Sequence, residues 1–404
     1  MTDTGLLQRF ADLVIRVGVN VQPGQGVVVR ADTAHLEVAR AVVDRAYAAG
    51  AGWVDIEWTD GPIQRSRLLH SGMDQLTRSR PWMLERIDSW GTEGVCFISL
   101  AGNPDPHLLD DVDPVKAAAR SLDEALARDR ALIDNQLRWT VVAAPNPGWA
   151  TQIFGEPDVD RLWAAVATAM RLDEPDPVAS WRDRNAELSA RAAALDALKL
   201  TQVRYHGSGT DLTVGLLPET RWTGGGDEDP GGLFYIPNIP TEEVFTSPDR
   251  RQADGRIRLT KPVVVGGRLV EGLEVAFAAG RITDVTATSG ADIVRAQLDT
   301  DEGARSLGEV SLVDRDSRIA KAGIVFHNTL FDENAGCHVA WGFSFPFAVT
   351  GGLDMSNDQR YELGLNRSTV HTDVVIGGEG LTVTGTGPGG SVDIIRDDEW
   401  VLPV

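Results

Sequence analysis

The chain has 404 residues, of which 42% are hydrophobic and 24% are charged, a composition typical of a globular protein with about two to three domains. Its formal net charge of −21 argues against a nucleic-acid partner and against binding to an anionic membrane surface. Because it has only two cysteines and no apolar run of about 18 residues, we expect a protein of the reducing cytoplasm with neither a disulfide framework nor a membrane-spanning segment.

The first half of the chain alternates between short apolar runs and segments with helical spacing. Phe10, Leu13, Val14 and Val17 recur on one helix face and predict an opening helix. Buried strands are predicted at residues 26–31, 52–58, 95–102 and 139–145. Further helices are predicted at residues 36–50, 113–134, 158–171 and 178–198. We therefore expect residues 1–200 to form an α/β domain with a largely parallel sheet.

The second half, residues 201–404, has a different pattern of hydrophobic residues. Short runs of alternating Val, Thr, Ile and Leu are separated by glycines, as in QVRYHG, TDLTVGLL and RITDVTA. This pattern is typical of antiparallel strands and hairpins. One helix is expected at residues 292–300. We therefore predict a β-rich α+β domain that begins after a boundary near residue 200.

Three of the seven histidines lie in the stretch that ends at Asp373. His371 and Asp373 are two positions apart in the strand-like sequence HTDVVIGG, so their side chains point to the same face of a strand. Asp373 is followed by apolar residues, and a buried carboxylate is costly unless it is paired or binds a metal. His338 lies next to Cys337, which we interpret as a packing residue that points the opposite way. His327 is either a hydrogen-bond donor behind a metal ligand or a structural residue.

Carboxylates accompany these histidines. Glu309 begins an apolar strand in GEVSLVD. Glu242 and Glu243 lie in IPNIPTEEVFTSPDRR, whose prolines favour an extended loop over a helix. Adjacent residues of an extended chain face opposite sides, so one of these two glutamates can bind a metal while the other acts elsewhere.

Glu243, Glu309, His338, His371 and Asp373 together offer more ligands than one catalytic zinc requires. With one carboxylate bridging, they suit two divalent ions about 3.5–4 Å apart. Zinc, cobalt, manganese and magnesium all accept carboxylate and imidazole ligands. Such a pair polarises a carbonyl and delivers hydroxide, which suits amide hydrolysis with a free carboxylate as general base.

Four segments also resemble the signature segments of the thermophilic-type metallo-aminopeptidases, the family of the aminopeptidase T and S types. They are NIPTEEVFTSP, GEVSLVDRDSRI, FDENAGCHVAWG and LGLNRSTVHTDVVIGG, and the N-terminal opening fits as well. The resemblance implies a homodimer whose β-rich C-terminal domain holds two metal ions and cleaves peptides at the N-terminus. It carries the ligand role to the same five residues, with Glu309 as the bridge, and it makes Glu242 the candidate general base.

One position departs from this family. Seven residues after the histidine that corresponds to His338, the family usually has a tyrosine, whereas this chain has Phe345. A phenol there could donate a hydrogen bond to a tetrahedral oxyanion or steady a ligand. Its loss therefore bears on the rate or on the substrate preference.

Three alternatives remain open at this point. The same metal site could serve an amidase that acts on a small-molecule amide, with Phe345 reflecting that specialisation. His338, His371 and Asp373 alone would make the two-histidine, one-carboxylate set of a non-haem iron oxygenase, although Glu243 and Glu309 would then have no role. A non-catalytic member of the family with a degenerate site is the third alternative, and the complete ligand set counts against it.

Overall fold

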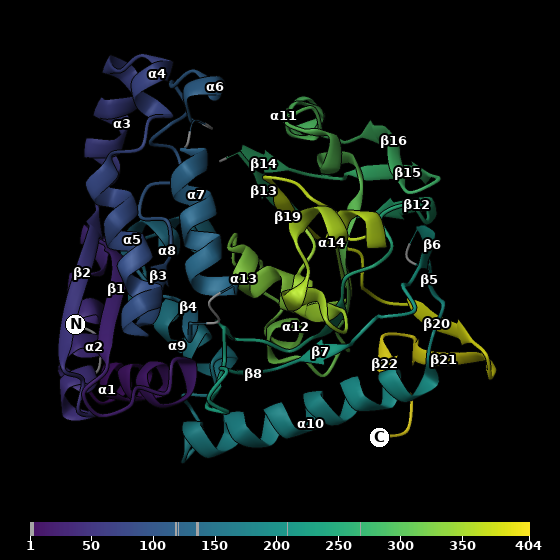
Figure 1. The fold of residues 1–404 in the computed structure, drawn as a ribbon, viewed down its shortest axis with the longest axis horizontal. Helices are drawn as coiled ribbons and strands as arrows, with labels where there is room; N and C mark the ends of the chain where they lie inside the picture. Colours follow the sequence, from purple (N-terminus) through teal and green to yellow (C-terminus); the bar gives the residue numbers. More distant parts are fainter. Residues whose placement is uncertain (1–3, 118, 120, 135–136, 208, 267) are drawn as a thin grey trace. The chain divides into compact units, whose positions relative to one another are not determined.

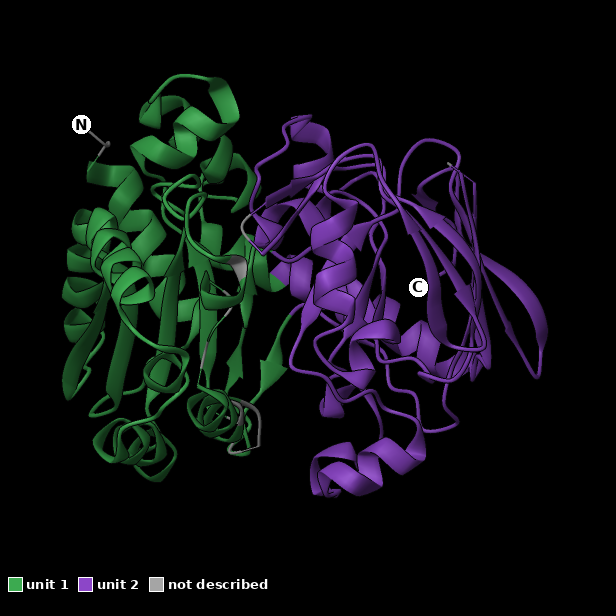
Figure 2. Cartoon of the chain, turned by 90° about the horizontal axis from the view of Figure 1, so that it is seen from above, with its two compact units in different colours: residues 1–182, 226–240 green, residues 183–225, 241–404 purple. Residues whose placement is uncertain are grey.

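The computed structural model describes residues 4–117, 119, 121–134, 137–207, 209–266 and 268–404. The chain divides into two compact units, one of residues 1–182 and 226–240 and one of residues 183–225 and 241–404 (Figure 2). The chain passes between them first within α10 (Pro177–Leu198). The boundary predicted near residue 200 falls just after this helix. Among the described residues, no helix is both long and apolar enough to cross a bilayer.

The first unit is built on a parallel sheet, as its alternating sequence predicts. The strand order is β10-β4-β3-β1-β2, and every pairing in this sheet is parallel. Figure 1 shows β2, β1, β3 and β4 side by side. The strands are β1 (Gly26–Asp32), β2 (Trp53–Thr59), β3 (Cys96–Ala101), β4 (Trp139–Ala143) and β10 (Asn238–Ile239), with a short hairpin of β8 (Asp227–Glu228) and β9 (Phe234–Tyr235). The first four confirm the predicted strands.

Helices precede, connect and follow the first four of these strands. They are α1 (Thr4–Leu13), α2 (Leu36–Ala48), α3 (Gly61–His70), α4 (Met73–Leu76), α5 (Pro81–Glu93), α6 (Pro114–Ala117), α7 (Leu122–Asp129), α8 (Pro147–Phe154) and α9 (Val159–Ala169). The prediction of one helix over residues 113–134 was wrong. Ser121 starts a new helix there, because its side chain accepts a hydrogen bond from the Glu124 N–H at 3.2 Å.

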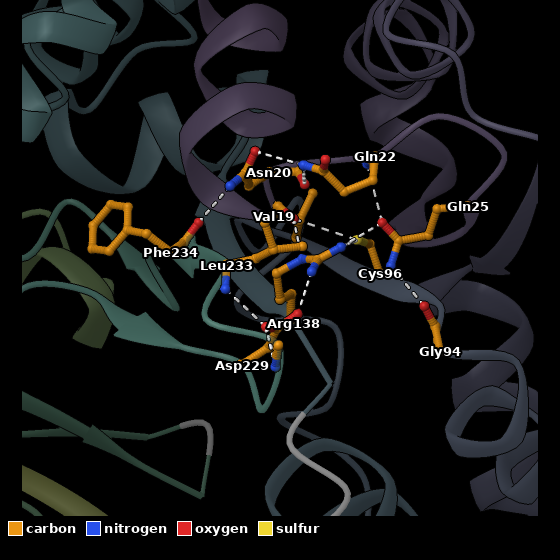
Figure 3. A network of polar contacts seen from close by, with 11 residues as sticks. Val19, Asn20, Gln22, Gln25, Gly94, Cys96, Arg138, Asp229, Leu233 and Phe234 are labelled. Atoms are coloured by element: carbon orange, nitrogen blue, oxygen red, sulfur yellow. Dashed lines mark hydrogen bonds and ion pairs between the residues drawn. The ribbon is translucent and has the colours of Figure 1, made fainter.

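Arg138, which is buried and directly precedes β4, joins the segment 226–240 to the rest of this unit (Figure 3). Its guanidinium pairs with Asp229, and its Nε–H donates to the Val19 carbonyl at 3.0 Å. The side chain of Asn20 donates to the Phe234 carbonyl at 2.8 Å. A buried arginine is stable only with such partners, so these contacts fix both segments together.

The second unit contains the sheet that carries the candidate ligands. Its order is β19-β18-β17-β11-β7, and all of its pairings are antiparallel. The strands are β7 (Thr223–Gly224), β11 (Val244–Thr246), β17 (Leu307–Leu312), β18 (His338–Gly342) and β19 (His371–Val375). In register, Ser311 lies opposite His338, and Ala340 lies opposite Asp373.

A larger antiparallel sheet completes the β-rich unit, with the order β16-β15-β12-β6-β5-β20-β21-β22. Its strands are β5 (Gln202–Gly207), β6 (Thr210–Gly215), β12 (Ala253–Arg258), β15 (Glu274–Ala278), β16 (Arg281–Thr286), β20 (Thr382–Gly387), β21 (Gly390–Arg396) and β22 (Glu399–Trp400), beside a hairpin of β13 (Val263–Val265) and β14 (Arg268–Val270). The predicted helix is α11 (Ala291–Leu298), and the short helices α12 (Arg318–Ala322), α13 (Thr329–Asp332) and α14 (Asn357–Leu363) were not predicted. Side chains from both sheets form one apolar core, which includes Tyr205, Val310 and Trp341.

Candidate metal centre

The candidate ligands come from neighbouring strands of one sheet. Glu309 lies on β17, His338 begins β18, and His371 and Asp373 lie two positions apart on β19. Glu243 directly precedes β11, which pairs with β17. Because β11, β17, β18 and β19 are adjacent in the sheet, side chains that are 130 positions apart in the sequence meet on one face.

The five side chains form two sets that share Glu309. Glu243, Glu309 and His338 form one set, and Glu309, His371 and Asp373 form the other, with the ligand atoms of each set within 4.8 Å of one another. His338 Nε2 lies 3.0 Å from a Glu243 oxygen and 3.6 Å from a Glu309 oxygen. His371 Nε2 lies 3.3 Å from both Glu309 and Asp373.

The two sets differ in exposure. The side chain of His338 is 1% exposed, whereas that of His371 is 23% exposed. Glu309, between them, is 5% exposed, and Asp373 is 12% exposed. The site is therefore closed around His338 and partly open to solvent beside His371.

Backbone carbonyls orient both imidazoles. His338 Nδ1 lies 3.2 Å from the Gly336 carbonyl, and His371 Nδ1 lies 2.8 Å from the Phe343 carbonyl. With each Nδ1–H donating to a carbonyl, each Nε2 turns toward the carboxylates. A histidine that ligates a metal is commonly held in this way, because the bond at one nitrogen fixes the tautomer and leaves the other nitrogen free to ligate.

The carboxylates stabilise the protonated form of both histidines. Burial alone would lower the pKa of His338, but Glu243 and Glu309 outweigh burial and raise it well above its usual value. Burial also opposes protonation of His371, whose pKa is raised by Asp373 and Glu309. Burial would raise the pKa of Asp373, yet His371 lowers it. The site therefore stabilises positive charge at the position of the imidazoles.

Glu242 faces away from this group, as expected for the neighbour of Glu243 in an extended loop. Its carboxylate lies 2.8 Å from Arg184 Nη2 of α10, and its side chain is fully buried. Its backbone N–H donates to Asn334 Oδ1 at 2.6 Å. The chain at Glu242 and Glu243 lies outside regular secondary structure, in agreement with the loop that the prolines predict.

Glu333 is a carboxylate of the site that was not predicted from the sequence. It lies on a short 3₁₀ turn (Glu333–Ala335) that precedes β18. Together with Asp373, it lines a cavity. Desolvation and the negative charges of Asp373 and Glu243 raise its pKa well above the usual value. Its position five residues before His338 was the only sequence signal, because a 3₁₀ turn has no hydrophobic period.

Cys337 and His327 lie outside both ligand sets. The Cys337 thiol contacts the Val313 carbonyl at 3.4 Å, and burial raises its pKa to about 12, so it is a packing residue as predicted. His327 lines the same cavity as Glu333, and burial lowers its pKa. It has a left-handed backbone conformation with φ of 52°.

The donor set fits divalent metal ions. Glu243, Glu309 and Asp373 bring three carboxylates to two imidazoles, so the group keeps a net negative charge even with both histidines protonated and Glu333 neutral. Burying uncompensated charge is expensive, and bound cations remove that cost. Carboxylate oxygens with imidazole nitrogens are ligands that zinc and similar divalent metals accept.

Comparison with known proteins identifies the family. The family described as thermophilic metalloprotease (M29) matches residues 4–400. Aminopeptidase T of Thermus aquaticus is 38% identical over 407 residues, and Aminopeptidase 2 of Geobacillus stearothermophilus is 35% identical over 404 residues, each covering 98% of both chains. The solved structure of wild-type AmpT from Thermus thermophilus matches with a TM-score of 0.86 at 35% identity, over 98% of this chain and 99% of that one. These matches confirm the resemblance found in the sequence: the chain belongs to the M29 family of thermophilic metalloproteases and is a metallo-aminopeptidase.

Proposed function

We propose that the chain removes N-terminal residues from short peptides with two divalent metal ions. Glu243, Glu309 and His338 would hold one ion, and Glu309, His371 and Asp373 the other. The observation that carries this proposal is the presence of Glu309 in both ligand sets. A carboxylate has two oxygens, so one glutamate can serve two ions at once.

When bound, the metal ions supply Lewis-acid activation of water and of the scissile carbonyl. The identity of the ions is left open among zinc, cobalt, manganese and magnesium, because this donor set accepts all four. The protein holds its ligands ready through the carbonyls of Gly336 and Phe343, which fix the two imidazoles. A preorganised site of this kind does not have to rearrange during the reaction.

A glutamate would move the proton from water to the leaving amine. We assign this role to Glu333, because its carboxylate lines the cavity beside Asp373 and its raised pKa suits both accepting and returning a proton. Glu242, which the family resemblance favours, stays the alternative. Its full burial and its ion pair with Arg184 make a role in positioning Glu243 more consistent with its surroundings.

An aminopeptidase must also recognise the free α-amine of its substrate. Asp373 lines the cavity next to the site, and its negative charge, which the lowered pKa favours, suits an ammonium group. We further propose a cytoplasmic homodimer. The two free, buried cysteines are compatible with a reducing compartment, and the dimer follows from the family resemblance.

The test is release of amino acids from dipeptides and aminoacyl amides, with matched substrates whose α-amine is acetylated. We expect hydrolysis of the free-amine substrates alone, loss of activity with a chelator and recovery on adding back metal. Equal hydrolysis of the acetylated substrates would favour the amidase instead. Activity that survives complete metal removal would overturn the mechanism.

A further inference from the structure

Four phenylalanine side chains meet beside the metal centre. Phe245 lies on β11, Phe343 and Phe345 follow β18, and Phe347 lies on the next 3₁₀ turn. We name this group the phenylalanine cluster. The Phe345 ring is its centre, 5.6 Å from Phe343, 5.8 Å from Phe245 and 5.3 Å from Phe347, measured between ring centroids.

The cluster adjoins the open side of the centre. The Phe345 ring lies 5.1 Å from the His371 ring in an edge-on arrangement. The Phe343 carbonyl accepts the hydrogen bond of His371 Nδ1 at 2.8 Å. Since His371 is the more exposed of the two histidines, the Phe345 ring lies beside the more accessible part of the centre.

The four rings are only partly buried, which is unusual for neighbouring phenylalanines. An apolar patch left open beside a polar site is typical of a ligand pocket, since a bound side chain completes the packing. A tyrosine at position 345 would add a hydroxyl, whereas Phe345 makes this wall purely hydrocarbon.

Hydrogen bonds hold the cluster in place. The Phe345 N–H donates to Ser247 Oγ at 2.9 Å, and the Phe343 N–H donates to the Val370 carbonyl at 2.8 Å. Ser247 is fully buried, and its hydroxyl in turn donates to the Phe345 carbonyl at 3.3 Å. A wall fixed in this way loses little conformational entropy when a ligand binds.

We infer that the phenylalanine cluster is the subsite for the side chain of the substrate's N-terminal residue, and that it selects aromatic and large aliphatic residues. This inference rests on the proposed function, which puts the N-terminal carbonyl at the metal centre. The side chain of that residue is attached one carbon away from this carbonyl, close to the Phe345 ring, which contacts His371. Lysine or glutamate side chains would lose hydration there without gaining a polar partner from the rings.

The kinetic experiment measures kcat/KM for Phe, Leu, Ala, Lys and Glu amides with one common leaving group. We expect the Phe and Leu substrates to exceed the Ala substrate by at least about tenfold, and the Lys and Glu substrates to be the poorest. Phe347→Ala should lower kcat/KM for the Phe substrate by about tenfold and for the Ala substrate by less than about twofold, with metal content unchanged. Phe154→Ala, which removes a partly exposed phenylalanine of the other unit, is the matched control and should change neither.

Equal losses on all substrates, or a wild-type enzyme without preference, would overturn the inference. Phe347→Leu, which keeps an apolar side chain, should shift the preference from Phe toward Leu and serves if the alanine variant does not fold. Calorimetry with phenethylamine and ethylamine, which carry the amine and side chain of Phe and Ala but no bond that can be hydrolysed, separates the two proposals. If the metal-loaded protein hydrolyses nothing but binds phenethylamine at least about tenfold more tightly than ethylamine, and this difference is lost in Phe347→Ala, the activity is refuted and the subsite is retained. Equal binding of the two amines would refute the subsite.

Discussion

Arg184 Nη2 lies 2.8 Å from a carboxylate oxygen of Glu242, and both side chains are buried. Arg184 also pairs with Glu187 at 2.7 Å, and Arg191, two turns further along α10, lies 2.7 Å from Asp314. Since Glu243 follows Glu242 directly, the ion pair holds the loop that presents a candidate metal ligand. Breaking this pair should therefore affect both the stability and the metal site.

Arg184→Ala tests this role. It would leave the Glu242 carboxylate buried without its guanidinium partner, so we expect the free energy of unfolding to fall by about 3–5 kcal/mol. Urea denaturation of the metal-free protein measures this change. Arg182→Ala, at an exposed position of the same helix, should stay within about 0.5 kcal/mol of the wild type. Equal effects of the two substitutions would show that the pair has no structural role.

Glu333→Gln tests the assignment of proton transfer. The amide keeps the shape of the side chain but cannot accept the proton, so kcat should fall at least about 100-fold while bound metal is retained. Glu242→Gln should instead weaken metal binding and change kcat less. Glu362→Gln, at an exposed position of α14, is the control. A 100-fold loss in Glu242→Gln at full metal content, with Glu333→Gln active, would transfer the role to Glu242.

Metal affinity should rise with pH. The pKa values of His338 and His371 are raised in the metal-free protein, and a metal must displace their protons. We expect competition with a chelator at pH 6 to 9 to show that the logarithm of the metal affinity rises with a slope of up to about two per pH unit, because two protons are displaced. The rise should end when both imidazoles are neutral. Affinity that does not change over this range would contradict the ligand assignment.

The raised pKa values of His338 and His371 also determine how the stability of the metal-free protein changes with pH. A folded-state pKa above the unfolded value of 6.5 stabilises the fold fully below that value, and this contribution is lost as pH rises through the folded pKa values. Denaturation of the metal-free protein should therefore show lower stability as pH rises above about 6.5. Replacing His338 and His371 by glutamine should reduce this slope, and the raised pKa of Glu333 leaves a remainder of the same sign.

Local pattern was enough to predict the strand that carries His371 and Asp373, because two-residue alternation decides which face each side chain takes. It was also enough for the parallel sheet of the first unit and for the loop at Glu243. The buried ion pair of Arg184 was not predicted, because an arginine on a helix is normally exposed and its partner, Glu242, is 58 positions away in the sequence. The phenylalanine cluster was not predicted either, because Phe245 and Phe345 are far apart in the sequence and are brought together only by the sheet.

Phe345→Tyr tests how the replacement of the family's usual tyrosine by phenylalanine affects kcat. The ring of Phe345 lies 5.1 Å from that of His371, so an added hydroxyl would lie close to the open side of the centre. There it could donate a hydrogen bond to the oxyanion of the tetrahedral intermediate, and we expect kcat to rise about tenfold on every substrate. Phe154→Tyr adds the same hydroxyl to a partly exposed phenylalanine of the other unit, and it should leave kcat unchanged. A rise limited to one substrate class would mean that position 345 acts through side-chain recognition alone, and an unchanged or lower kcat would show that the site stabilises the oxyanion without a phenol.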